Sequence, residues 1–219
     1  MRAGWIMAAL LLAVPAGAAK KVRIPKDAPY CAAPDTRALF VSPMGEPFRG
    51  ASGQPYPSTL WFAAADRNSD GAVDRVEFLA DAARFFARLD TDHDGRLTPD
   101  EVTAYERDVA PEISLYAARR APVPVRRPKL KSGESGYWYP TGAGQFAWLN
   151  IPQPVSGADA DIDRVVTRGE FLAAAGRRFD TLDSKAQGRL VLAALPRTPQ
   201  QAEIEGPCQP VPAPRQARR

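Results

Sequence analysis

The amino-acid sequence predicts an all-α fold of duplicated helix–loop–helix pairs, with short β-bridges between loops and proline-rich flanking segments. The first observation is an acidic twelve-residue pattern that occurs in tandem, each time followed by a helix-like segment. The second is an internal repeat, because residues 73–102 align without a gap with 166–195 and are identical at 14 of 30 positions. Thirdly, 22 prolines and 16 glycines among 219 residues place much of the remaining chain in loops.

The N-terminus has the features of a secretory signal peptide. Arg2 precedes an apolar run from Trp5 to Val14, and the small residues Ala16 to Ala18 follow it. This order predicts that residues 1–19 are removed and that the mature protein is periplasmic or secreted. No apolar run reaches the roughly 18 residues of a transmembrane helix, so the sequence predicts no membrane span.

Composition divides the mature chain into five segments. Residues 20–57 are a proline-rich N-terminal segment, and residues 58–117 hold the first acidic pair. A linker at 118–145 combines six basic residues with a stretch rich in glycine and aromatic residues. The second pair occupies residues 146–195, and residues 196–219 form a proline- and arginine-rich tail with little to bury.

Two cysteines lie near opposite ends of the mature chain. Cys31 and Cys208 both stand in proline-rich surroundings, and an exported protein reaches an oxidising compartment. The sequence therefore predicts a disulfide that ties the two flanks together, with free or intermolecular thiols as the alternative.

The first acidic loop, loop 1 (66–77), has oxygen-bearing side chains at positions 1, 3, 5, 9 and 12 and a glycine at position 6. Calcium takes six to eight hard oxygens at about 2.3–2.6 Å, and the glycine permits the sharp turn that makes the early side chains converge. The expected ligands are Asp66, Asn68, Asp70, the backbone carbonyl of Ala72, Asp74 and both carboxylate oxygens of Glu77.

Loop 2 (90–101) begins 24 residues after loop 1 and satisfies every position of the same pattern. Its expected ligands are Asp90, Asp92, Asp94, the backbone carbonyl of Arg96, Thr98 and Glu101. Positions 9 to 12 also read as a helix-capping box, here with proline as the first helical residue. Two complete matches in tandem predict two sites for Ca²⁺.

The second copy has a degenerate loop and a vestigial one. Loop 3 (159–170) offers Asp159, Asp161, Asp163, the backbone carbonyl of Val165, Thr167 and Glu170. Arg164 replaces its glycine, and a left-handed non-glycine residue costs about 1–2 kcal/mol, so calcium binding there is expected to be weaker or absent. Loop 4 (183–194) keeps its glycine but carries Lys185, Gln187 and Ala194 at ligand positions, which predicts a loop retained for packing.

These loops resemble those of the EF-hand superfamily. Three segments outside them resemble, more narrowly, a group of small exported bacterial EF-hand domain proteins: residues 39–48 (LFVSPMGEPF), 61–66 (WFAAAD) and 149–155 (LNIPQPV). The resemblance covers roughly half of the mature chain. It implies calcium binding outside the cytoplasm and no known reaction.

Helical periodicity predicts how the loops are separated. Residues 58–65 are expected to form a short helix with Ser58 as its N-cap, and residues 75–89 a longer one with an apolar stripe that serves as core rather than as a target-binding groove. The longer helix both leaves loop 1 and enters loop 2, so it holds them about 20 Å apart. We therefore expect β-bridges between first-copy and second-copy loops, with the choice of partners left open.

The sequence favours an exported calcium-binding protein, either a sensor or a module stabilised by calcium. Residues 66–108 contain 12 acids against 6 bases, and bound calcium would offset this excess. A competing hypothesis is an adaptor that binds the envelope or a polyanion through its basic linker and tail, with an unknown protein or envelope partner and no specific nucleic acid. We do not expect an enzyme, because His93 is the only histidine and stands at loop position 4.

Overall fold

A computed structural model of the chain describes residue 31 and residues 36–51, 53–114 and 140–208. The predicted signal peptide, the basic part of the linker and the end of the tail lie outside these residues. Within the described part, no helix is both long enough and apolar enough to cross a lipid bilayer.

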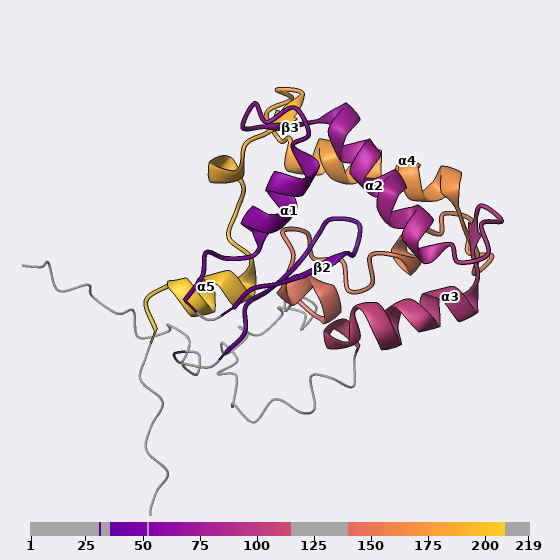
Figure 1. Cartoon of the computed structure of the whole chain (residues 1–219), viewed down its shortest axis with the longest axis horizontal. Coiled ribbons are helices and arrows are strands. Elements are labelled where there is room, and N and C mark those ends of the chain that lie inside the picture. Colours follow the sequence, from indigo (N-terminus) through magenta and orange to yellow (C-terminus); the bar gives the residue numbers. More distant parts are fainter. Residues whose placement is uncertain (1–30, 32–35, 52, 115–139, 209–219) are drawn as a thin grey trace, which may run out of the picture.

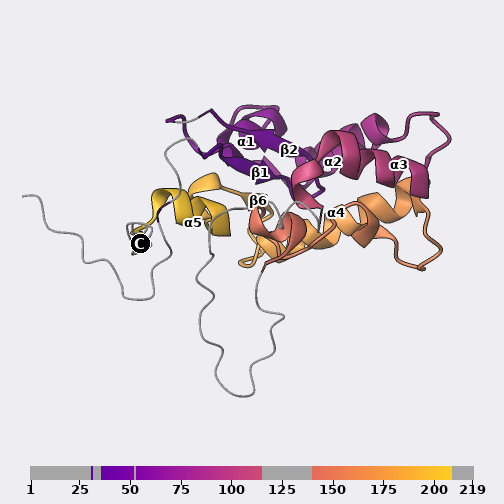
Figure 2. The ribbon, with the colours of Figure 1, turned by 90° about the horizontal axis from the view of Figure 1, so that it is seen from below.

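Two antiparallel helices form the centre of the mainly helical fold. Helices α2 (Arg75–Leu89) and α4 (Arg168–Leu182) come from the two copies of the repeat and lie side by side (Figures 1 and 2). Aromatic pairs join them, with ring centroids 5.4 Å apart for Phe86 and Phe171 and 5.5 Å apart for Phe78 and Phe179. The apolar stripe predicted on α2 is therefore core, because it packs against the matching face of α4.

Short antiparallel strands join the loops of one copy to those of the other, as expected. Strand β3 (Val73–Asp74) of loop 1 pairs with β6 (Arg189–Leu190) of loop 4. Strand β4 (Arg96–Leu97) of loop 2 pairs with β5 (Val166–Thr167) of loop 3. The two loop pairs lie at opposite ends of the α2–α4 pair (Figure 1).

The helices that flank the loops are complete only in the first copy. Helix α1 (Ser58–Ala65) enters loop 1, and α3 (Pro99–Ala104) leaves loop 2 and continues as a π-helical turn at Tyr105–Val109. Loop 3 is entered through a short 3₁₀ turn at Ser156–Ala158, and loop 4 ends in another at Leu192–Ala194. The expectation of helix–loop–helix units in both copies is wrong for these two flanks, where nearby prolines disfavour α-helix.

Helix α1 begins differently from the prediction. Its N-cap is Pro57, with φ −68°, and Ser58 is a buried residue inside the first turn rather than the cap. Proline has no N–H to satisfy and a backbone angle already suited to a helix, so it can occupy the start without a side-chain cap.

A β-hairpin lies within the segment that composition marked only as a proline-rich flank. Strands β1 (Leu39–Val41) and β2 (Pro47–Arg49) pair in antiparallel register, and Phe40 is fully buried. The Phe40 ring lies 4.6 Å from that of Trp148 and 6.1 Å from that of Trp61, measured between centroids. The hairpin is therefore part of the core and covers α1 and the segment before loop 3.

The beginning of the C-terminal tail is also folded, although no residue of its helix is buried. Helix α5 (Pro199–Glu205) starts after the fully buried Thr198, whose hydroxyl lies 2.7 Å from that of Tyr56. The backbone N–H of Leu39 donates to Gln200 Oε1 at 2.7 Å. The predicted disulfide between Cys31 and Cys208 is present, and it closes the two flanks beside α5.

Buried polar groups fix the middle of α2 to its neighbours. Asp81 accepts a hydrogen bond from Trp61 Nε1 at 2.9 Å and ion-pairs with Arg84, which also binds Glu46 of the hairpin. Arg88 Nη1 reaches the same Glu46 at 3.0 Å. The two carboxylates are only 8% exposed, and the hydrogen bond to Glu46 raises the pKa of Arg84 despite partial burial. We call these five residues the α2 anchor.

Helix α4 is held through a buried arginine. Arg178 is 5% exposed and donates to the backbone carbonyls of Pro43 at 2.8 Å and Pro154 at 2.9 Å. Burial lowers its pKa to about 10, because the charged guanidinium is removed from water. These bonds join α4 to the hairpin turn and to the segment before loop 3.

Candidate metal centre

All four loops share one backbone conformation. Position 4 has a positive φ in each loop, and so does position 6, where a left-handed residue makes the sharp turn. The position-6 residues are Gly71 (82°), Gly95 (81°), Arg164 (73°) and Gly188 (74°). In each loop, the N–H at position 6 donates to a carboxylate oxygen of the aspartate at position 1, at 2.6–3.0 Å. The first aspartate therefore organises the turn even where later ligands are missing.

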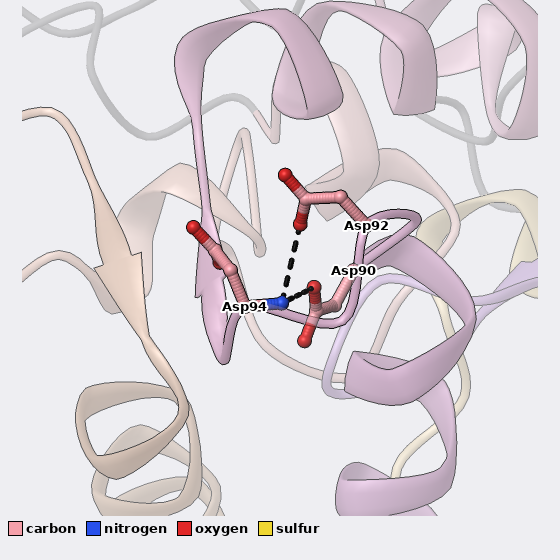
Figure 3. A group of neighbouring side chains, drawn as sticks. All are labelled: Asp90, Asp92 and Asp94. Atoms are coloured by element: carbon pink, nitrogen blue, oxygen red, sulfur yellow. Dashed lines mark hydrogen bonds between the residues drawn. The ribbon is translucent and has the colours of Figure 1, made fainter.

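Loop 2 brings three carboxylates together. Figure 3 shows Asp90 and Asp92 turned toward the backbone nitrogen of Asp94, which donates to them at 3.1 and 3.2 Å. One oxygen from each of the three aspartates lies within 4.8 Å of the others. Oxygens that share one calcium ion at about 2.4 Å are separated by no more than about 4.8 Å, so this spacing is compatible with a shared ion.

The glutamate at position 12 closes loop 2 onto the following helix. Glu101 Oε1 accepts from the Thr91 N–H at 2.8 Å, and Oε2 accepts from the Thr98 N–H at 2.9 Å. The Thr98 hydroxyl in turn accepts from the Glu101 N–H, so the predicted capping box is formed. Burial raises the pKa of Glu101, but the hydrogen bonds from Thr98 and Thr91 outweigh it and hold the pKa below its usual value.

Loop 1 has the same internal hydrogen bonds. Asp66 accepts from the N–H groups of Asp70 at 3.1 Å and Gly71 at 3.0 Å. Glu77 Oε1 accepts from the N–H of Asn68 at 3.1 Å, and its Oε2 accepts from that of Asp74 at 3.0 Å. Asp74 Oδ1 accepts from the Glu77 N–H at 2.8 Å, which completes the capping box that starts α2. Glu77 is thereby hydrogen-bonded to both the beginning and the end of the loop, at Asn68 and Asp74.

The segment that carries loops 1 and 2 matches a known protein family. A family model described as EF hand matches residues 59–80 and 82–104, which contain loops 1 and 2 with their flanking helices. This segment belongs to the EF-hand superfamily. No curated protein and no solved structure matches the chain significantly.

The loops of the second copy have EF-hand geometry without a match to the family model. In loop 3, one oxygen each of Asp159, Asp161 and Glu170 lies within 4.8 Å of the others. The Thr167 hydroxyl and N–H and the Ala160 N–H lower the pKa of Glu170 to about 2, so this carboxylate is ionised at neutral pH. Arg164 holds the left-handed position, and its side chain is exposed.

Loop 4 keeps the turn without the ligands. Asp183 accepts from the N–H groups of Gln187 at 2.9 Å and Gly188 at 2.6 Å, as the first aspartate does in the other loops. Leu190 is buried against Val73 across the β3–β6 bridge. The loop thus has the features expected of one retained to complete a bridge.

The oxygen-bearing residues of loops 1 and 2 fit calcium. Their donor sets contain only carboxylate, amide, hydroxyl and carbonyl oxygens, which suit a hard cation. Glu77 Oε2 accepts one hydrogen bond and keeps a lone pair for a metal ion, whereas Glu77 Oε1 and both Glu101 oxygens each accept two, one of which an ion would have to replace. Ala72 and Arg96, whose carbonyls are expected at position 7, stand at the start of the bridges, since Ala72 precedes β3 and Arg96 begins β4. EF-hand domains of this kind indicate calcium binding.

The sequence did not show how the loops contact one another outside the strands. The Arg168 N–H, at the start of α4, donates to the carbonyl of Gly95 at 3.1 Å. This bond joins the turn of loop 2 to the end of loop 3. It depends on the antiparallel packing of α2 and α4, which no residue pattern specified.

Proposed function

We propose that this protein is an exported calcium-binding EF-hand protein whose two strong sites are loops 1 and 2. The observation that carries the proposal is the convergence of three carboxylate oxygens within 4.8 Å of one another in loop 2, in a backbone that loop 1 reproduces. The ligands would be those predicted from the sequence, with Glu77 and Glu101 supplying two oxygens each. Binding would stabilise the fold, because the ion binds the folded loops only.

Loop 3 is proposed as a weaker third site. The convergence of Asp159, Asp161 and Glu170 supports it. The strained Arg164 opposes it, through its left-handed backbone and its positive charge beside the loop. Extracellular EF-hand modules have dissociation constants on the order of 10⁻⁴–10⁻³ M, and loop 3 is expected to be weaker than loops 1 and 2.

A calcium-stabilised structural module accounts for the core better than a sensor does. The apolar face of α2 is covered by α4, and Met44 is buried at 3% exposure. A sensor would need this face to separate and offer an adaptable surface to a target. The disulfide is compatible with an extracellular or periplasmic location and supports the proposed export. We propose binding rather than catalysis as the activity.

Calorimetric titration of residues 20–219 with CaCl₂ tests the function. We expect two dominant sites, one lost in Glu77→Gln and the other in Glu101→Gln. Asp100→Asn is the matched control, because Asp100 is an exposed acid inside loop 2 that stands at no ligand position. Absence of calcium-dependent heat and of any gain in melting temperature at millimolar CaCl₂ would refute the proposal.

A further inference from the structure

A pocket of about 310 Å³ lies between α1, α5 and the segment that follows loop 4 (Figure 1). It shares no residue with loops 1, 2 and 3. Small-molecule sites are concave, mostly apolar and equipped with a few polar groups, and this volume lies at the lower end of their range. We propose that the pocket binds a free α-amino acid with an apolar side chain. The inference goes beyond the calcium sites and does not rest on them.

The apolar wall of the pocket is formed in advance of any ligand. Trp148 lines the pocket together with Leu192 and Leu195. The Trp148 ring is fixed against the core, with its centroid 4.6 Å from that of Phe40 and 5.4 Å from that of Trp61. A wall held in this way loses little side-chain freedom when a ligand binds to it. It therefore suits the burial of one small aliphatic or aromatic side chain.

Ser58 supplies a buried polar group to the pocket. It lines the pocket at the first turn of α1 and is only 4% exposed. Within the described residues, neither its hydroxyl nor its backbone N–H has a hydrogen-bond partner. The neighbouring Thr59 hydroxyl, by contrast, donates to the Tyr56 carbonyl at 2.9 Å.

The position of Ser58 indicates what could satisfy it. A buried polar group without a partner destabilises a fold, so native proteins rarely keep one unless a ligand or an ordered water pairs with it. The hydroxyl and the N–H of Ser58 also stand at the positive end of the α1 dipole. Two donors at this end of a helix suit one carboxylate group.

Two opposite charges at the pocket suit a dipolar ligand. Arg197 makes no hydrogen bond or ion pair with the described residues, so its guanidinium is available to a carboxylate. Glu205 Oε2 accepts from Gln201 Nε2 at 3.1 Å, whereas its Oε1 accepts no bond from the described part of the chain and is available to an ammonium group. A purely anionic ligand would be repelled by Glu205, and a purely cationic one by Arg197. An α-amino acid carries both groups on one carbon.

Calorimetric titration of the mature protein, residues 20–219, tests the inference. The probes are L-leucine, L-methionine and L-phenylalanine, with the same CaCl₂ concentration in both solutions so that calcium contributes no heat. We expect at least one of them to bind with one-to-one stoichiometry and to shift the indole N–H resonance of Trp148 in ¹⁵N spectra. The deaminated and decarboxylated forms of the amino acid that binds most tightly should each bind about tenfold more weakly or worse, because each leaves one charge of the pocket unpaired.

Ser58→Ala separates a ligand contact from a structural role. Without a ligand, it should leave the melting temperature unchanged or raise it, because it removes an unpaired buried hydroxyl and places a better helix former in α1. It should also weaken binding about fivefold, and Arg197→Gln and Glu205→Gln should each weaken it about tenfold. Glu203→Gln is the matched control, since Glu203 is an exposed acid of α5 that does not line the pocket, and it should leave the affinity within about twofold.

Each contrary outcome overturns a particular step. Absence of heat and of any Trp148 shift with all three amino acids at millimolar concentration would show that the pocket holds water only. Binding that the Ser58, Arg197 and Glu205 variants leave unaltered would place the ligand elsewhere and refute the site. Equal affinity of the deaminated or decarboxylated form would refute the recognition of a dipolar ligand. A lower melting temperature of ligand-free Ser58→Ala would show that the hydroxyl already has a structural partner and would also contradict the inference.

Discussion

Arg164→Gly is expected to stabilise the calcium-free protein. Arg164 occupies the left-handed turn of loop 3 with φ 73°, and its side chain is exposed, so truncation removes little packing. The reverse change, Gly95→Ala in loop 2, is expected to destabilise it. Gly95 has φ 81°, and a methyl group there would meet no atom of the described residues within 4 Å. Both substitutions therefore act through the backbone.

The magnitude follows from two opposing contributions. Relief of a left-handed non-glycine residue is worth about 1–2 kcal/mol. Glycine adds conformational entropy to the unfolded chain, which removes about 0.4–1 kcal/mol of that gain. The net effect of Arg164→Gly is then an increase of about 0.5–1 kcal/mol in the free energy of unfolding. Gly95→Ala reverses both contributions and lowers the free energy of unfolding by a similar amount.

Urea denaturation in EDTA measures both variants without interference from metal. With a urea dependence of about 2 kcal/mol per molar, the midpoint should move by about 0.3–0.5 M, upward for Arg164→Gly and downward for Gly95→Ala, at unchanged slope. Midpoint shifts of the same sign in the two variants, or a destabilised Arg164→Gly, would refute the strain argument. The glycine would then have been replaced in loop 3 without a backbone penalty.

Three further predictions concern the core and its polar ties. Leu97→Ala removes a fully buried side chain at the β4–β5 bridge and should lower the free energy of unfolding by about 2–5 kcal/mol in denaturant titrations. Val76→Ala, at a 75% exposed site, should change the free energy of unfolding little. Arg84→Met leaves the buried carboxylates of Glu46 and Asp81 without their main cation and should lower the free energy of unfolding by about 2–3 kcal/mol. Arg107→Met, at a surface ion pair, should have a negligible effect. Equal losses in the two variants would contradict the argument. Burial raises the pKa of Tyr56 to about 12 from 10. The unfolded chain therefore loses this proton between pH 10 and 12 while the folded chain retains it, so stability should fall across that range, less steeply in Tyr56→Phe.

Local patterns were sufficient to predict the loops. The spacing of aspartates, glycine and glutamate located loops 1 and 2, the acidic spacing without the glycine located loop 3, and the internal repeat located loop 4. The capping boxes at Asp74, Thr98 and Thr167 form as expected. The 24-residue interval between loops 1 and 2 also indicated that their bridges must go to the other copy. Each of these features depends on residues that lie close together in the chain, so the sequence displays them directly.

Other elements depend on contacts between distant residues. The β-hairpin at 39–49 is buried by Trp61 and Trp148, and α5 is held by bonds such as that between Leu39 and Gln200, which are 161 positions apart. Neither segment has a strong periodic pattern of its own. Their proline-rich composition pointed to loose flanks, and only tertiary packing placed the hairpin in the core and held α5, which has no buried residue, against it.

The sequence by itself determined where the acidic loops begin and end, which oxygens they offer and why one helix must keep loops 1 and 2 apart. Only the tertiary structure decided that loop 2 faces loop 3 and loop 1 faces loop 4. The physical reason is the antiparallel packing of α2 on α4, which brings the start of each helix to the end of the other. Loop chemistry is local to twelve residues, whereas the choice of partner is a property of two whole helices in contact.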